Sequence, residues 1–210
     1  MSDTAPLSTQ IRDPDQLRRH YARPRAAAEM KSLDRLDEFS KGFIGWSPFL
    51  VLASCDAQGR VDASPRGDQP GFVGIPDDHT LLIPDRPGNN RLDTMTNILT
   101  NAGVGMLFFI PGFDETLRVN GTASILTDEN LRAQWLVNGR PALAVIRVAV
   151  REVYFHCGKA LKRSELWNPA VQRDRKTFPS HGRIIAEQTK AVSIAESEAY
   201  VEKSYKERLY

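Results

Sequence analysis

The chain has 210 residues, of which 41% are hydrophobic and 26% are charged, proportions that are ordinary for a globular protein. Its 28 basic and 26 acidic side chains leave a net charge of only +2, too balanced to bind nucleic acid by general phosphate neutralisation. Because no apolar run approaches the roughly 18 residues that cross a bilayer, we expect no membrane segment. Any anion-binding site must therefore be local.

The first residues and the two cysteines bear on location and on metal chemistry. Residues 1–16, MSDTAPLSTQIRDPDQ, lack the basic start and the apolar stretch of a secretory signal, so we expect a cytoplasmic protein. Cys55 and Cys157 lie outside any CxxC or His/Cys array of metal-ligand spacing. We therefore predict no zinc site and no disulfide framework, and we expect both thiols to be buried.

The first part of the chain predicts helices and the next part predicts strands. Residues 14–42 are rich in Arg, Ala, Leu and Glu and carry apolar residues at helical spacing, which indicates helices that flank a core. From residue 47 onward, FLVLASCD, RVDASPRG and HTLLIPD read as strands separated by Gly, Pro and Asp. This succession is typical of a β-meander.

A short helix interrupts the strands. The segment NNRLDTMTNILTN places Leu92, Met95 and Leu99 on one helical face, with Asn89 or Asn90 as the N-cap. VGMLFFIPG and ETLRVNGTASIL then predict an antiparallel hairpin. TDENLRAQWLVN predicts a further helix, and ALAVIRVAVREVYFHC predicts a long central strand. The last third of the chain is polar and helical.

These elements predict a mainly β, α+β fold. The strands come as hairpins and not as alternating βαβ units, which disfavours a parallel sheet. We expect a small antiparallel barrel with flanking helices, whose closure removes exposed strand edges. The expected organisation is an N-terminal helical extension packed on the barrel (1–44), a barrel core (45–160) and a C-terminal helical segment (161–210).

The loop in LLIPDRPGNNRLD brings cations to the start of a helix. Arg86 and Arg91 bracket PGNN, Gly88 permits close backbone approach, and Asn89 and Asn90 carry amide donors. Helix N-termini and arginines bind anions, so one interpretation is an anion site. The other is an ordinary capped turn with two solvated arginines. The loop matches neither GxxxxGK[ST] nor GxGxxG, so those modes of nucleotide binding have no support.

A second polar stretch, DASPRGDQPGF, closes a predicted strand. Ser64, Pro65 and Arg66 place a hydroxyl and a guanidinium beside a turn, and the strand that follows runs toward the basic loop. Arg66 could therefore share one ligand with the two loop arginines. In the alternative interpretation, Asp68 neutralises Arg66 in a surface pair worth less than about 1 kcal/mol.

The order of these motifs resembles the pyridoxamine 5'-phosphate oxidase-related family of FMN-binding split-barrel proteins. The likeness covers residues 45–155, through FLVLASCDAQGRVDASPRGDQPGFV, TLLIPDRPGNNRLDTMTNILTNAGVGMLFFIPG and TLRVNGTASIL. The helix supplies Asn97 and Asn101 to an N-L-x-x-N-like motif, and the later strand supplies Val119 and Gly121. SPRGD and PDRPGNNRLD are similar to one subgroup of FMN-dependent proteins. The resemblance implies an antiparallel split β-barrel of the FMN-binding type.

The resemblance also implies a cofactor site, in which the basic loop holds the FMN phosphate through Asn89, Asn90 and Arg91, with Arg86 beside them. The backbone at the preceding strand end would follow the ribityl chain and the ring edge, and the SPR segment would lie near the polar edge of the ring or the phosphate. The residues so implied to bind FMN are Ser64, Pro65, Arg66, Pro84, Asp85, Arg86, Asn89, Asn90, Arg91, Arg118 and Lys159.

Proteins of this family usually form homodimers with flavin at the interface, so we expect one here. Arg118 lies on the strand that commonly adds a polar side chain from the neighbouring subunit. The family's C-terminal Trp-Arg segment has no convincing equivalent, and YFHCGKALKRSELWNP is the candidate to complete the pocket. Lys159 could approach the flavin ring or a substrate anion. The other candidates in this segment are His156, Lys162, Arg163 and Trp167, whose alternative roles are ordinary packing or a solvated face.

The function implied by the resemblance is an FMN-dependent oxidoreductase acting on a small organic substrate. It would be either an oxidase that uses oxygen or a reductase that uses a nicotinamide donor. The flavin carries the redox chemistry, so no side-chain nucleophile is required, and no catalytic residue is assigned. Two alternatives stay open: a flavin-binding protein without turnover (a carrier, store or sensor), and a split barrel that binds deazaflavin or haem.

Overall fold

The computed structural model describes residues 10–210, and the chain divides into two units, residues 1–32 and 33–210. The first unit contains two short helices, α1 (Pro14–Arg19) and α2 (Ala26–Met30). Asp13 caps α1 by accepting a hydrogen bond from the backbone N–H of Gln16. Neither helix contains a buried residue, and α2 has no side-chain cap hydrogen bond. The domain boundaries expected after residues 44 and 160 stay predictions.

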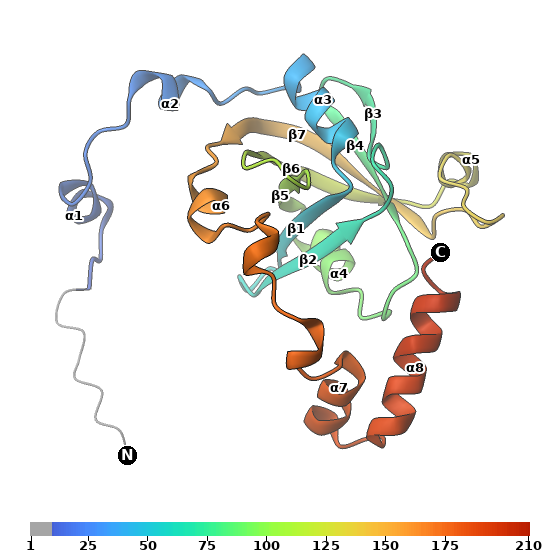
Figure 1. Cartoon of the computed structure of the whole chain (residues 1–210). Helices are drawn as coiled ribbons and strands as arrows, with labels where there is room; N and C mark the ends of the chain where they lie inside the picture. The colour runs from blue at the N-terminus through green and yellow to red at the C-terminus, as the bar shows by residue number, and fades with distance from the viewer. Residues whose placement is uncertain (1–9) are drawn as a thin grey trace. The chain divides into compact units, whose positions relative to one another are not determined.

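The second unit is built on a seven-stranded antiparallel sheet with the order β2-β1-β5-β6-β7-β4-β3 (Figure 1). Consecutive strands pair as hairpins at β1–β2, β3–β4, β5–β6 and β6–β7, which confirms the predicted α+β fold with an antiparallel sheet. The strands are β1 (Phe49–Cys55), β2 (Val61–Gly67), β3 (Gly74–Asp77), β4 (Thr80–Asp85), β5 (Gly103–Phe109), β6 (Thr116–Leu126) and β7 (Ala144–His156).

The ladder of strand pairs is open. Among the described residues, β2 and β3 stand at its two ends, so each keeps one unpaired edge. The expectation that closure would remove the edges is therefore wrong, and the fold is a split barrel only in a loose sense. Edge strand β2 contains Pro65, and an edge is where a sheet tolerates the missing N–H of proline.

Helices flank the sheet. α3 (Glu38–Trp46) is capped by Asp37 and buries Phe43 and Ile44, whereas α4 (Asp93–Thr100) buries Met95 and Ile98. In Figure 1, α7 and α8 form a helical hairpin near the end of the chain. The other helical segments are α5 (Glu129–Ala133), α6 (Lys159–Ser164), α7 (His181–Thr189), α8 (Ile194–Glu207), η1 (Pro169–Val171) and η2 (Arg175–Thr177).

The core follows the two-residue alternation of the strands. On β1 and β5 the register opposes Leu50 to Phe108 and Leu52 to Met106, and all four side chains are at most 2% exposed. Successive side chains in a strand point to opposite faces, so the intervening residues of β1 and β5 face outward. At β1 and β5 the sheet therefore has one buried face and a second face that is partly exposed.

Two local predictions are wrong because tertiary packing decides them. Leu92 and Leu99 are 56% and 77% exposed, and α4 turns Thr94 toward the sheet together with Met95 and Ile98. The two thiols are not buried: Cys55 is half-buried and Cys157 is exposed. Cys55 belongs to the outward-facing set of β1, and Cys157 follows the end of β7.

Gly121 lies at an irregularity in the β6–β7 register, where the two backbones approach closely. A Cβ there would be 2.3 Å from the carbonyl oxygen of Ala149 and 2.8 Å from Cγ1 of Val148. We predict that Gly121→Ala lowers the free energy of unfolding by about 1–3 kcal/mol, as overpacking usually does. Urea unfolding measures this change. Gly42→Ala, in α3 with open space around it, is the control and should be neutral or slightly stabilising; equal losses would contradict the prediction.

Candidate functional site

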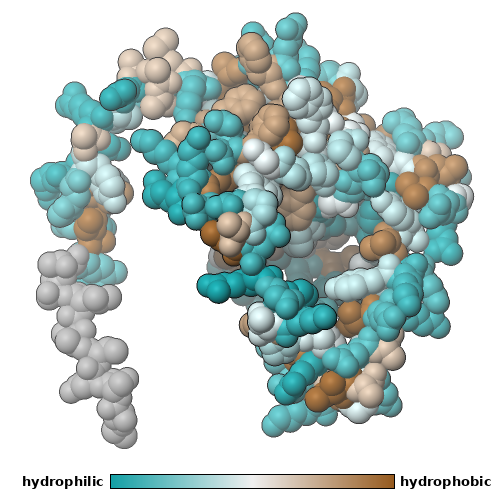
Figure 2. Space-filling model, viewed as in Figure 1, coloured by the Kyte–Doolittle hydropathy of each residue, from teal (hydrophilic) through white to brown (hydrophobic). Residues whose placement is uncertain are grey.

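A pocket of about 630 Å³ lies where the ends of β2 and β4, the loop after β4 and the start of α4 come together. Its volume is typical of small-ligand sites. Figure 2 shows the surface hollowed in this region, between the sheet and the hairpin α7–α8. Nine of the residues predicted to bind a cofactor line it: Ser64, Pro65, Arg66, Pro84, Asp85, Arg86, Asn89, Asn90 and Arg91.

Strand β2 supplies one wall of the pocket because its polar residues alternate. Asp62, Ser64 and Arg66 are half-buried, and the residues between them are exposed, so the three polar side chains share one face. Asp62 accepts a hydrogen bond from the Thr94 hydroxyl at the start of α4. This contact fixes α4 against the polar face of β2.

Two ion pairs connect the walls of the pocket. Arg66 on β2 lies 2.6 Å from Asp85 at the end of β4, and Arg86 lies 2.9 Å from Asp68. The side chain of Asp68 is only 6% exposed. Arg86 also donates to the backbone carbonyl of Trp135 at 2.8 Å. The alternative pairing of Asp68 with Arg66 is therefore wrong: Asp85 neutralises Arg66, and Asp68 neutralises Arg86.

Arg66 keeps one unused donor. Its Nε is buried and has no hydrogen-bond partner within the described chain. Buried polar groups are normally satisfied, so an orphaned donor in a pocket wall needs an explanation. A ligand atom that accepts a hydrogen bond from this Nε would be such an explanation. The polar side chains that line the pocket support it.

The loop between β4 and α4 has unusual backbone geometry. Asn90 and Leu92 both adopt positive φ, 57° and 59°, and Leu92 occupies the N-cap position of α4. Asparagine tolerates this conformation, but for leucine it is strained, and such strain concentrates at functional sites. The loop is held partly by the backbone N–H of Arg91, which donates to the side chain of Asn89 at 3.1 Å.

The predicted N-cap is wrong, and the correction strengthens the anion-site interpretation. Neither Asn89 nor Asn90 caps α4, and within residues 10–210 no side chain accepts a hydrogen bond at the Leu92 cap. The first backbone N–H groups of a helix lack intrahelical acceptors and favour anions. Arg91 stands beside them, 72% exposed and paired at 2.8 Å with Asp93. This carboxylate raises the pKa of the Arg91 guanidinium, which stays charged.

The pocket also contains residues that the sequence did not indicate. Tyr210 lines it, and its hydroxyl donates to Asp68 at 2.9 Å, although the two residues are 142 positions apart. Cζ of Arg86 lies 5.4 Å from the centroid of the Tyr210 ring. Phe72, Leu143 and Leu209 add an apolar part to the lining. No local pattern signals these contacts, because they depend on how the last helix folds back.

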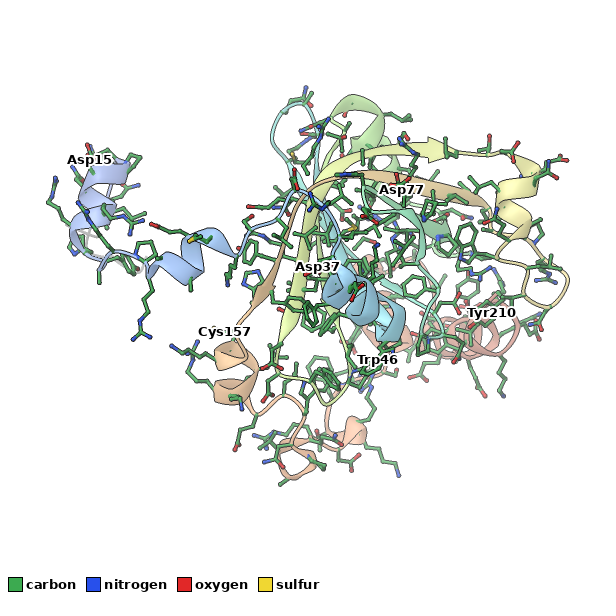
Figure 3. All side chains as sticks on the ribbon, turned by 90° about the horizontal axis from the view of Figure 1, so that it is seen from above. Asp15, Asp37, Trp46, Asp77, Cys157 and Tyr210 are labelled. Atoms are coloured by element: carbon green, nitrogen blue, oxygen red, sulfur yellow. The ribbon has the colours of Figure 1, made fainter. Side chains whose placement is uncertain are left out.

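Arg118 and Lys159 do not line this pocket. Arg118 on β6 donates to Glu152 at 3.0 Å and its Cζ lies 4.0 Å from the centroid of the Tyr154 ring. Figure 3 shows Cys157, next to α6, on the opposite side of the sheet region from Tyr210. A role for either residue in the same site would therefore require a second copy of the chain.

The remaining candidates in the segment after β7 do not line the pocket either: His156, Lys162, Arg163 and Trp167. Trp167 donates through Nε1 to the carbonyl of Phe113 at 2.7 Å, and Lys162 lies 3.2 Å from Asp114. These contacts fasten α6 and its flanks to the β5–β6 turn. In the protomer, this segment therefore packs against the turn and does not complete the site.

Fold and pocket together define an α+β protein with a small-ligand site beside one edge strand of an antiparallel sheet. The sequence profile described as Pyridoxamine 5'-phosphate oxidase matches residues 36–157, more than half of the chain. The chain belongs to this family. Among the described residues, no helix is long and apolar enough to cross a membrane, and no group of three or more His, Cys, Asp and Glu residues is arranged to hold a metal ion.

Several solved structures are similar to this chain. HupZ from Group A Streptococcus is 22% identical with a TM-score of 0.46, and the match covers 56% of this chain and 91% of that chain. An F420 reductase is 18% identical with a TM-score of 0.42, covering 58% and 98%. An FMN-binding protein from Syntrophomonas wolfei is 10% identical with a TM-score of 0.43, covering 57% and 89%. No match was found among curated proteins.

The contact between Tyr210 and Asp68 predicts an altered titration. The hydrogen bond to the Asp68 carboxylate, with a smaller contribution from burial, raises the pKa of Tyr210 above its usual value near 10. A raised pKa means that the folded state favours the protonated phenol. The resulting stabilisation is complete below the pKa of an unfolded tyrosine and is lost as the pH rises through the folded pKa.

Ultraviolet difference titration of the native protein against Tyr210→Phe isolates this phenol. We expect its transition to lie above the usual pKa of tyrosine near 10. A transition at or below that value would show that the Asp68 contact does not persist in solution.

Proposed function

We propose that this protein is an FMN-dependent oxidoreductase that transfers electrons or hydride to or from a small organic substrate. The observation that carries the proposal is the uncapped, strained start of α4, which offers free backbone donors beside Arg91 in one pocket with the ends of β2 and β4. Membership of the family supports the choice of a flavin. A cytoplasmic location stays part of the proposal.

The residues of the pocket fit FMN. The first turn of α4, Asn89, Asn90 and Arg91 would hold the phosphate, because backbone N–H, amide and guanidinium groups all donate to phosphate oxygens. The orphaned Nε of Arg66 would donate to a polar edge of the ring system. Bound FMN supplies the redox chemistry, and the chain supplies binding, orientation and charge around it.

The composition of the purified protein tests this proposal directly. We expect a yellow protein with absorption bands near about 370 and 450 nm, as bound flavins show, and FMN in the supernatant after denaturation, identified by mass. Release of a deazaflavin or haem would contradict the FMN assignment. Stopped-flow reduction by nicotinamide donors, followed by exposure to oxygen, then separates an enzyme from a flavin carrier, store or sensor, which would show no turnover.

Arg91 is the residue whose change should affect phosphate binding most specifically. We predict that Arg91→Glu weakens FMN binding by about ten- to a hundredfold, since a charge-assisted hydrogen bond is worth about 1.5–3 kcal/mol. Quenching of flavin fluorescence on titration measures the dissociation constant. Arg173→Glu, at an exposed position outside the pocket, makes the same charge change and should leave affinity unaltered. Unaltered affinity in folded Arg91→Glu would refute the phosphate assignment.

We also propose that the protein forms a homodimer with the flavin near the interface. The outward face of β1 and β5 carries Phe49, Val51, Leu107 and Phe109, which lie opposite one another in register. Large contiguous apolar surfaces usually mark interaction sites. Arg118 is the register partner of Leu107 on β6, so it lies at the border of this face, within reach of a second copy docked there.

Leu107→Glu tests the dimer. A charge in the middle of an apolar interface costs several kcal/mol unless it is paired, so we expect a native dimer and a monomeric variant in analytical ultracentrifugation. FMN affinity should fall together with dimerisation if the second copy completes the site. Leu136→Glu replaces a 58% exposed leucine elsewhere and should stay dimeric. A monomeric native protein that binds FMN with full affinity would contradict this part of the proposal.

A further inference from the structure

The hairpin formed by α7 and α8 is a tightly joined unit. Gly182 on α7 packs so closely on α8 that a Cβ at this position would lie 2.6 Å from Cα of Glu198. Ser180 caps α7 and its hydroxyl also donates to Glu198. At the start of α8, Ser193 and Glu196 form a reciprocal capping box. These contacts join the two helices into one packed unit.

The hairpin is joined to the rest of its unit through Tyr210. In the described chain, the hydrogen bonds between residues 180–210 and residues 33–179 end on this residue. Its hydroxyl donates to Asp68 at 2.9 Å, and Nη1 of Arg140 donates to its carbonyl oxygen at 3.1 Å. Figure 3 labels Tyr210 at this junction. One residue therefore carries these hydrogen bonds, one through its side chain and one through its backbone.

The segment that leads to the hairpin has no buried anchor. Residues 168–179 are all exposed, and they contain two short 3-10 turns but no longer helix. Segments with few buried apolar contacts open at low free-energy cost. The hairpin can therefore swing about this tether once the contacts of Tyr210 break.

We infer that the hairpin α7–α8 is a lid on the pocket and that Tyr210 is its latch. Tyr210 and Leu209 both line the pocket, so closure of the hairpin places them over the bound ligand. The latch closes on Asp68, the same buried carboxylate that pairs with Arg86 in the pocket wall. Asp68 therefore takes part both in lid closure and in the charge balance of the site. The inference rests on the proposed function, because the ligand enclosed is the proposed FMN with its substrate.

Tyr210→Phe is the central test, because it removes the latch hydroxyl and keeps the ring. We expect FMN to dissociate about ten- to a hundredfold faster, the effect of losing one hydrogen bond to a charged acceptor, which is worth about 1.5–3 kcal/mol. Tyr210→Ala also removes the ring and should dissociate FMN at least as fast. Tyr205→Phe makes the same chemical change on the exposed side of α8 and should keep the native rate.

A distance measurement follows the lid without any ligand. Nitroxide labels on Cys157, which is exposed, and on α8 through K203C report the separation of hairpin and core, with Cys55→Ser preventing a third label. We expect a narrow distribution for the native latch and for Tyr205→Phe, and a broad one for Tyr210→Phe and Tyr210→Ala.

The two readouts separate failure of the lid from failure of the proposed function. Unchanged distance distributions in both Tyr210 variants overturn the latch, whatever the ligand. Broadened distributions with an unchanged FMN dissociation rate overturn the lid and leave FMN binding intact. If the native protein binds no FMN, the proposed function fails, and the latch is decided by the distance distributions alone.

Discussion

The ion pair between Arg66 and Asp85 is the contact on which the site depends. β2 and β4 are far apart in the order of the sheet, so backbone hydrogen bonds do not join them. The pair spans that gap at 2.6 Å with both side chains largely buried. It holds the edge strand beside the end of β4, and the pocket lies between them. Removing one partner of a buried pair leaves an uncompensated charge and is strongly destabilising.

The pocket balances its charges pair by pair. Arg66, Arg86 and Arg91 each have an aspartate within 3 Å. Simple accumulation of positive charge is therefore not the basis on which we propose anion binding. The groups proposed to select an anion are directional donors. They are the backbone N–H groups at the start of α4 and Arg91, whose exposed carboxylate partner Asp93 a ligand oxygen can replace. This directionality supports the proposal of a compact, terminal phosphate.

The sequence predicted the antiparallel strands other than β3 and the loop after β4, because alternation and turn residues are local properties. It did not predict β3, which has only four residues. It predicted the wrong cap for α4, since a leucine at positive φ contradicts local preference. It also assigned Asp68 to the wrong arginine, because two acidic and two basic side chains close in sequence allow more than one pairing. Tyr210 could not be predicted, since its partner Asp68 is 142 residues away.

Pro65 has a consequence for how two copies of the chain can meet. It lies on β2, whose outer edge is unpaired and borders the pocket. A free edge normally offers a row of donors and acceptors on which another chain can add a strand. Proline removes one donor from that row, so the sheet resists being lengthened at this edge. A strand that paired with this edge beside the pocket would lack a hydrogen-bond donor opposite it at Pro65.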